Sequence, residues 1–473
     1  MGLELAFTDK QITPWGGMAL MKNMLERIDW DRAVLAAQLP QPGSNRGYAP
    51  EQLVGQFMLS IWCGANRFEH LEATRFDPVI GQVFGYERMA NYKAFTRLID
   101  KFDQASIHSV FPSLYQHCFA QVGLQTLTLD LDSTVLTRYG QHQGAQRGYN
   151  PSKRGRASHH PLMAFVADSR MLANVWLRPG NSSSANNAIS FLQSSLDNVG
   201  CNSGHKRVGL LRADSGFCDN AFLSHLEQSK LPYTVAMRLT RPLQHQLVNA
   251  RWWPLQSEQP VQTEQQSRRA PPAVPASTGI ELCELHYQAD SWEAPRRIIG
   301  VRQHIHTKPD AKGKTLSLFA DDEAISGWRY AAIVTDLQLP EVQVWRLYRG
   351  RADCENRIKE LKYDFALGTL VRRNFWATEA ALHFVMLSFN LMSLFRAAMQ
   401  HQINKTGTTH TLASLRQQLF AQAGFITHEG RKTILKLATA MQRRQWLSGL
   451  WDASKSFEKP ITAKRIFDPP ARL

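Results

Sequence analysis

The chain has 473 residues, and its 55 Lys and Arg against 40 Asp and Glu give a formal net charge of +15. This excess favours a polyanionic partner, because each phosphate neutralised by Lys or Arg releases condensed counterions, although charge alone does not separate DNA, RNA and anionic membrane. The six cysteines are scattered without a CxxC pair, which excludes a disulfide framework and a cysteine-rich zinc site.

Export and membrane insertion are not expected. Residues 1–10 lack the basic-then-apolar order of a secretory signal. The longest apolar run, residues 380–395, is short for a membrane span and contains His383, Ser388 and Asn390. We therefore expect a cytoplasmic protein in which residues 380–395 form a buried helix.

The first 125 residues are predicted to be helical. One helix begins at Pro50, and apolar residues recur near 3.6-residue spacing from Tyr92 to Val122. No helix-turn-helix signature stands out. A basic helical head nevertheless suits DNA recognition, so residues 1–125 are interpreted as a DNA-end-binding region.

At Thr126 the pattern changes to strands. The segment TLTLDLDSTVLT alternates, with Asp130 and Asp132 on the face opposite its leucines. PLMAFVADS and MLANVWLRPG follow around a tight turn at residues 168–170, which predicts an antiparallel meander. A helix (184–198), the strand VGLLRADSG, a helix (220–228) and the strand LPYTVAMRL come next. This order is that of a ribonuclease-H-like α/β core, and it places Asp132 and Asp214 on adjacent strands.

The α/β pattern breaks after residue 239. Residues 240–338 combine four strand-like pieces, IELCELHYQAD, RRIIGVRQHI, TLSLFADD and YAAIVTDL, with a Gln/Pro-rich loop at 255–278. We interpret this region as a β-rich insertion in the core whose first part is 126–239. A helix from Pro340 to Gly368 (region 339–370) would complete the core, and residues 371–473 are predicted to form a helical C-terminal region.

The predicted helix at 340–368 carries an unusual set of polar residues. Tyr348, Arg351, Glu355 and Lys362 fall at offsets of 0, 3, 7 and 14. At roughly 100° per residue they share a stripe of about 60°. A carboxylate flanked by two cations suits a metal site next to phosphate, although a solvated face with ordinary i,i+4 pairs explains the same residues.

Asp132, Asp214 and Glu355 together form the proposed catalytic and metal-binding centre. Two divalent ions need shared oxygen ligands and open positions for phosphate and water. Taken singly, Asp132 and Asp214 are equally well explained as turn or helix-cap residues. Asp130 is either a second ligand or a support.

The chain resembles the DDE transposases of bacterial insertion sequences, in the group with the Tyr-x2-Arg-x3-Glu-x6-Lys signature. The signature matches without a gap at Tyr348, Arg351, Glu355 and Lys362, and LDLDST and RADSGFCD hold the two aspartates. The resemblance covers about residues 50–400. It implies a ribonuclease-H-like core with an interrupting β-domain. The implied enzyme is a DNA nuclease and strand transferase that uses two Mg²⁺ ions (with Mn²⁺ substituting) and acts as a homodimer on double-stranded DNA.

The mechanism that the resemblance implies is a series of phosphoryl transfers. The ends of the element, at terminal inverted repeats, are nicked to free a 3′-hydroxyl, which forms a hairpin on the opposite strand. The reopened end then joins target DNA. Arg351, Lys362 and Tyr348 would contact phosphates, and the protein would lie in the bacterial cytoplasm, associated with the nucleoid.

Two further groups are predicted to contact DNA. The segment 137–160 is rich in Gly, Arg and Lys and lacks acids. We interpret it as a phosphate-binding loop rather than a plain solvated turn. Its phosphate contacts would come from Arg147, Lys153, Arg154 and Arg156. A hairpin mechanism needs a displaced base held against an aromatic ring. Trp328 and Tyr330 are the candidates, although packed aromatics at a strand start are the more common case.

Other functions remain open. A transposase-derived protein that binds DNA without cutting is one alternative, although all three carboxylates are present. A ribonuclease-H-like nuclease acting alone is disfavoured by the insertion and the signature residues. A membrane-surface role lacks the basic amphipathic helix that it would need.

Overall fold

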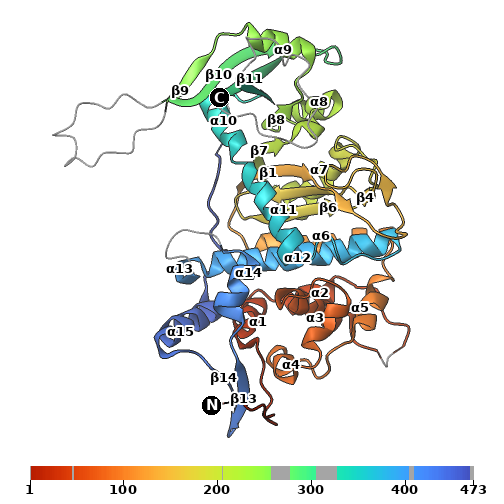
Figure 1. The fold of residues 1–473 in the computed structure, drawn as a ribbon, viewed down its shortest axis with the longest axis vertical. Coiled ribbons are helices and arrows are strands. Elements are labelled where there is room, and N and C mark those ends of the chain that lie inside the picture. The colour runs from red at the N-terminus through yellow and green to blue at the C-terminus, as the bar shows by residue number, and fades with distance from the viewer. Residues whose placement is uncertain are drawn as a thin grey trace, which may run out of the picture.

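The computed structural model describes residues 2–44, 47–204, 206–256, 277–304, 327–403 and 410–468. A nine-stranded mixed sheet fills its upper and middle parts, and most of the helices gather below it (Figure 1). The strand order is β6-β5-β1-β7-β8-β12-β11-β10-β9. The predicted α/β class is confirmed at this level.

The N-terminal region is helical, as predicted. Its helices are α1 (Ala19–Arg27), α2 (Trp30–Ala36), α3 (Pro50–Trp62), α4 (Pro78–Phe84), α5 (Tyr92–Ile99) and α6 (Gln104–Ala120). The segment from Tyr92 to Val122 is helical as predicted, and it is divided into two helices, α5 and α6. Asp103 caps the new helix: its carboxylate accepts the Ser106 N–H at 2.8 Å, and the Ser106 hydroxyl accepts the Asp103 N–H at 2.9 Å.

The first half of the sheet follows the predicted order. β1 (Thr126–Ser133), β5 (Leu162–Val166) and β6 (Met171–Trp176) form the antiparallel meander, and β7 (Arg207–Ala213) and β8 (Tyr233–Met237) are parallel to β1. Helices α7 (Ala188–Val199) and α8 (Asn220–Gln228) connect these strands. The strands are almost wholly buried, which explains their near-continuous apolar runs.

The β-rich region continues the same sheet. After α9 (Arg241–Val248), β9 (Trp253–Gln256), β10 (Ser277–Tyr287), β11 (Arg296–His304) and β12 (Trp328–Thr335) form antiparallel neighbours, and β12 pairs with β8. The predicted insertion is therefore a lateral extension of the core sheet. The strand TLSLFADD (315–322) and residues 257–276 of the predicted loop lie outside the described residues.

Two predictions for the later helices are wrong. The helix expected from Pro340 to Gly368 is divided into α10 (Glu341–Arg349) and α11 (Ala352–Asp364). The C-terminal region is not all helical, because β13 (Gly424–Glu429) and β14 (Lys432–Leu437) form a hairpin. Gly430 makes its turn with φ of +61°, a conformation that glycine adopts without strain.

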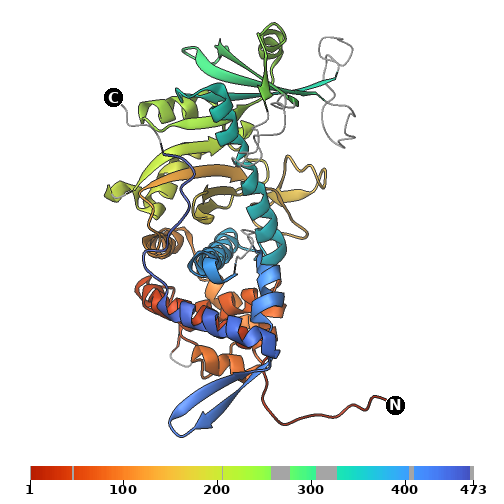
Figure 2. The same ribbon diagram turned by 90° about the vertical axis from the view of Figure 1, so that its left-hand side faces the viewer.

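Helix α12 (Phe375–Ala398) crosses between the sheet and the N-terminal helices (Figures 1 and 2). It is long and apolar enough to span a membrane, but 94% of its apolar window is buried within the protein. The predicted buried helix at 380–395 is therefore confirmed. Short helices α13 (Gln400–Ile403) and α14 (Leu412–Leu415) precede the hairpin, and α15 (Met441–Ser456) follows it.

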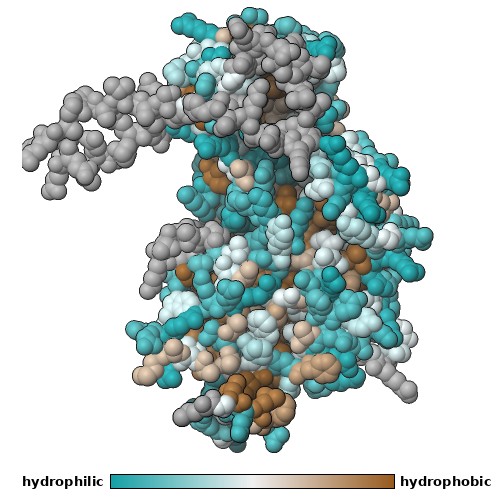
Figure 3. Space-filling view, in the orientation of Figure 1, coloured by the Kyte–Doolittle hydropathy of each residue, from teal (hydrophilic) through white to brown (hydrophobic). Residues whose placement is uncertain are grey.

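The face of the molecule seen in Figure 3 is largely hydrophilic, with an apolar patch at its lower end, near the hairpin and the N-terminal segment. Within that segment Leu3, Leu5 and Phe7 are fully or almost fully exposed. All six cysteines are free thiols, as the sequence predicted.

Candidate active site

The two predicted aspartates lie at the same edge of the sheet. β1 and β7 are parallel with Leu131 opposite Ala213, so Asp132 and Asp214 are the next residues on neighbouring strands. Asp132 is buried, whereas Asp214 ends β7 partly exposed and accepts a hydrogen bond from Gly216 N–H at 2.9 Å. The predicted adjacency of the two residues is confirmed. Carboxyl ends of parallel strands are a common place for such a site.

Asp132 is neutralised by an arginine of the signature. Arg351 Nη2 lies 2.9 Å from Asp132 Oδ2, and both side chains are about nine-tenths buried. Asp132 also accepts a hydrogen bond from Ser133 N–H at 2.8 Å and one from the Cys354 thiol. Burial raises the pKa of Asp132 to about 6; Arg351 opposes this rise and the nearby Asp214 carboxylate adds to it.

The signature residues do not share one helical stripe, because the helix breaks between α10 and α11. Tyr348 lies in the last turn of α10, Arg351 begins α11, and Glu355 and Lys362 follow on α11. Burial raises the pKa of the Tyr348 phenol, and Arg351 opposes the rise. The Lys362 ammonium lies 3.5 Å from Val135 O and does not line the groove described next.

Glu355 is exposed and faces a groove of about 420 Å³ between α10, α11 and the extended sheet. Tyr348 and Arg351 line the same groove, together with Val301, Ala331 and Ile333 of β11 and β12. Within the described residues, no group of three or more His, Cys, Asp or Glu side chains is arranged to hold a metal ion. The structure thus brings Asp132 and Asp214 together, with Arg351 between Asp132 and the helix of Glu355.

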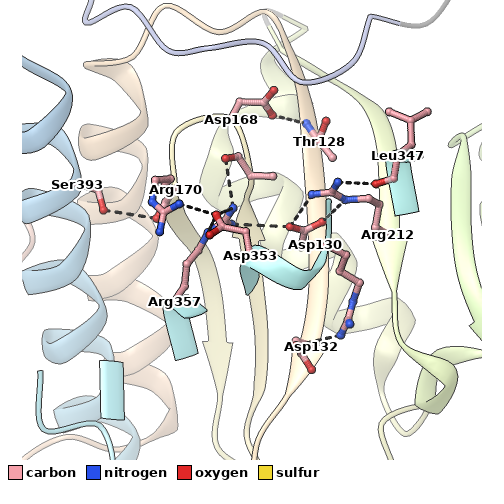
Figure 4. A network of polar contacts seen from close by, with 12 residues as sticks. Thr128, Asp130, Asp132, Asp168, Arg170, Arg212, Leu347, Asp353, Arg357 and Ser393 are labelled. Carbon is pink, nitrogen blue, oxygen red and sulfur yellow. Dashed lines mark hydrogen bonds and ion pairs between the residues drawn. The ribbon is translucent and has the colours of Figure 1, made fainter. Parts of the chain in front are cut away.

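A buried ionic network supports this arrangement from behind (Figure 4). Arg212 donates to both oxygens of Asp130, at 2.6 and 2.9 Å, and its third nitrogen donates to Leu347 O at 2.7 Å, in the last turn of α10. Arg357 of α11 contacts both Asp130, at 3.8 Å, and Asp353, at 2.9 Å. Of the two roles that the sequence left open for Asp130, the structure places it in the supporting one.

The family of the chain is shown by a match over almost its whole length. The model for transposase DDE domain group 1 matches residues 2–455. The chain belongs to this family. Among solved structures, the transposase is similar to the piggyBac transposase synaptic complex with hairpin DNA, with 13% identity, a TM-score of 0.41, and coverage of 90% of this chain and 89% of that one. No curated protein matches it.

The sequence did not predict a cluster of two hydroxyl groups and an imidazole, formed by Ser133, Ser184 and His160 of the transposase, that lies beside the aspartates. His160 Nε2 lies 3.1 Å from Ser133 Oγ, which is 3.0 Å from Ser184 Oγ. Burial lowers the pKa of His160, and Asp214 is close enough to oppose that shift. Adjacent His159 is structural, since Arg138 donates to it and burial lowers its pKa to about 4. The only sequence signal was the His-His pair that ends the cationic segment.

The cationic segment of the transposase is a small sheet of its own. β2 (Leu136–Thr137), β3 (Gln146–Arg147) and β4 (Ala157–His159) pair in the order β2-β4-β3. The four predicted phosphate-binding residues are all exposed: Arg147 ends β3, and Lys153, Arg154 and Arg156 lie in the loop between β3 and β4. They stay available to a phosphate backbone, and this role remains a prediction.

The two aromatic candidates lie on the other face of the sheet from the groove. Alternation along β12 puts Trp328 and Tyr330 opposite Ala331 and Ile333, which line the groove. Arg302 stacks over Trp328, with 4.4 Å from its guanidinium carbon to the ring centre. The structure therefore does not bring these rings to the aspartates of the same chain.

Proposed function

We propose that the chain is a DNA transposase that cleaves and joins the ends of an insertion sequence by metal-dependent phosphoryl transfer. Asp132, Asp214 and Glu355 are the proposed catalytic carboxylates. The observation that carries the proposal is the pairing of Asp132 and Asp214 on adjacent parallel strands, next to the helix of Glu355. The order β6-β5-β1-β7-β8, with an antiparallel meander and two parallel strands, supports a ribonuclease-H-like core.

The donor set fits Mg²⁺, with Mn²⁺ as a substitute. All three side chains offer only carboxylate oxygens, which hard divalent cations prefer. The buried Asp132 charge is already balanced by a cation, the Arg351 guanidinium. When bound, the ions supply Lewis-acid stabilisation of the attacking and leaving oxygens of a phosphoryl transfer.

The residues of the chain then position the DNA. Arg351 is released from Asp132 and donates to a phosphate beside the scissile one, since a guanidinium fork matches phosphate geometry. Tyr348 and Lys362 hold neighbouring phosphates, and the exposed cations of the small sheet follow the backbone further along. We propose the hairpin intermediate as part of this reaction, in a homodimer on paired ends.

One observation favours the alternative of a DNA-binding protein that does not cut. Arg351 forms an ion pair with Asp132, and within the described part of the chain Asp132, Asp214 and Glu355 are not grouped closely enough to hold a metal ion. In this alternative the ion pair is permanent, and the carboxylates serve only the fold.

Cleavage of DNA carrying the terminal inverted repeats that flank the gene separates the two functions. The assay compares Mg²⁺ with EDTA for the wild type, Asp132→Asn and Glu355→Gln, with exposed Glu293→Gln as the matched control. Metal-dependent nicking at the repeat ends, lost in the two site variants and kept in the control, supports the transposase. Tight binding to the repeat ends without cleavage in Mg²⁺ refutes the proposed catalysis and supports the alternative.

A further inference from the structure

The cluster of Ser133, Ser184 and His160 joins three segments of the chain beside the aspartates. Ser133 ends β1 and directly follows Asp132, His160 lies between β4 and β5, and Ser184 lies in the loop between β6 and α7. Ser133 and His160 are partly exposed, and Ser184 is 7% exposed. The cluster therefore lies at the edge of the sheet that carries the two aspartates, outside the hydrophobic core.

The hydrogen bonds of the cluster run in one direction. His160 Nδ1 lies 3.0 Å from Ser182 O, and a carbonyl oxygen only accepts, so Nδ1 carries the proton of the neutral ring. His160 Nε2 then accepts the Ser133 hydroxyl at 3.1 Å. The Ser133 oxygen is left to accept the Ser184 hydroxyl at 3.0 Å. The orientation of each of the three side chains is therefore fixed by its neighbour.

Ser184 also contacts the segment that follows the second aspartate. A methyl group on Gly216 would lie 2.8 Å from Ser184 Oγ and 2.9 Å from Ser184 Cβ, which is too close, so glycine is needed for Ser184 to pack there. The Gly216 N–H in turn donates to Asp214 Oδ1 at 2.9 Å. Ser184 thus bonds to the residue after Asp132 and packs on the residue whose amide holds Asp214.

A buried arginine holds the loop of Ser184 in place. Arg178 is 5% exposed, and its Nη1 donates to Ser183 O at 2.6 Å and to Asn186 O at 3.0 Å, on either side of Ser184. Its Nε donates to His160 O at 3.1 Å. One side chain therefore fixes both segments that contact Ser133, so Ser184 has a defined position between the two aspartates.

We propose that Ser184, acting through Ser133 and backed by His160, is a positioning residue that sets the separation of Asp132 and Asp214. This inference rests on the proposed function, in which the carboxylates hold divalent ions. The Ser133 N–H donates to Asp132 Oδ1 at 2.8 Å, so the orientation of that carboxylate depends on where the Ser133 side chain is anchored. Groups that orient metal ligands typically change metal affinity about 10–100-fold when they are removed.

The test measures Mn²⁺ affinity from the electron paramagnetic resonance signal of free Mn²⁺. The metal is titrated into the full-length protein bound to a duplex that ends at the terminal repeat, so that no flanking bond is cleaved. Ser184→Ala is expected to lower the Mn²⁺ affinity about tenfold and to leave duplex affinity in EDTA unchanged. Ser133→Ala should act in the same way, whereas Ser133→Thr keeps the hydroxyl and should stay close to the wild type. Cleavage of an uncut end by Ser184→Ala should recover at saturating Mn²⁺.

Ser183→Ala is the matched control, because it removes the same group one residue away, from an exposed side chain that donates to Asn186 Oδ1 at 2.9 Å. Equal Mn²⁺ affinities of Ser184→Ala and Ser183→Ala, with a wild type that binds Mn²⁺ and cleaves, overturn this inference alone. A fall in the midpoint of thermal unfolding or in duplex affinity that accounts for the loss of Mn²⁺ affinity shows a purely structural role and also overturns it. A wild type that neither binds Mn²⁺ nor cleaves refutes the proposed function, and this inference fails with it.

Discussion

The buried pair of Asp130 and Arg212 is predicted to hold the junction of α10 and α11 in place. Both side chains are at most 1% exposed, and Arg212 makes three hydrogen bonds, two to Asp130 and one to Leu347 O. Arg212→Met removes all three. The Asp130 carboxylate then keeps only Arg357, at 3.8 Å, and the last turn of α10 loses its partner.

The magnitude follows from the burial of the pair. Removing one partner of a buried ion pair typically costs about 3–5 kcal/mol, because the other charge is left uncompensated. Replacing both with apolar residues of similar size removes that cost. The double variant Asp130→Leu with Arg212→Met should therefore lose the contact to Leu347 O and the 3.8 Å contact between Asp130 and Arg357, which keeps Asp353 as its partner, and the expected cost is about 1–3 kcal/mol.

Urea unfolding followed by circular dichroism measures both variants. DNA-end cleavage at a temperature where both are folded is the second readout. The double variant should be more stable than Arg212→Met but should still cleave slowly, since α10 carries Tyr348 and the junction carries Arg351. A loss below 1 kcal/mol in Arg212→Met, or a double variant less stable than the single one, refutes the reasoning.

Three further predictions concern the junction, a buried acid and the exposed cations. A methyl group at Gly350 would lie 2.8 Å from Arg212 Nη1, so Gly350→Ala should cost about 1–3 kcal/mol in urea unfolding, whereas Gly449→Ala on α15, with 3.7 Å to its nearest neighbour, should be neutral or slightly stabilising. Burial raises the pKa of Glu379 to about 8, and its Oε2 has no hydrogen-bond partner among the residues that the structure describes. The pKa of Glu379 is higher in the folded than in the unfolded protein, so its protonated carboxyl group contributes to stability. This contribution is fully present below about pH 4.5 and is lost as the pH rises through 8. Glu379→Gln should thus match the wild type at pH 4 and exceed its stability by several kcal/mol at pH 9, and equal stabilities at pH 9 would contradict the shift. Replacing Arg147, Lys153, Arg154 and Arg156 with Gln should lower the slope of log affinity for DNA against log salt by up to about 3.6, and an unchanged slope in binding titrations would exclude phosphate contacts by this sheet.

Local patterns in the sequence determined the strands of the core and the position of its two aspartates. Alternating and continuous apolar runs identify strands directly, and the order of strands and helices leaves few topologies open, so Asp132 and Asp214 could be placed side by side. The hairpin at 424–437 was missed because its strands alternate only weakly and lie between helices.

Tertiary contacts decided the rest of the site. The pattern of residues 340–368 is compatible with one helix, and the break appears only where Arg212, from a strand more than a hundred residues earlier, meets Leu347 O. Two other features could not be predicted from the sequence: the face of the sheet on which Trp328 and Tyr330 lie, and the ion-pair partner of Asp132. Both depend on how segments that are distant in the chain pack together. The sequence by itself predicted which residues would carry the chemistry, whereas the packing of α10 and α11 on the sheet decided which of those residues lie next to one another.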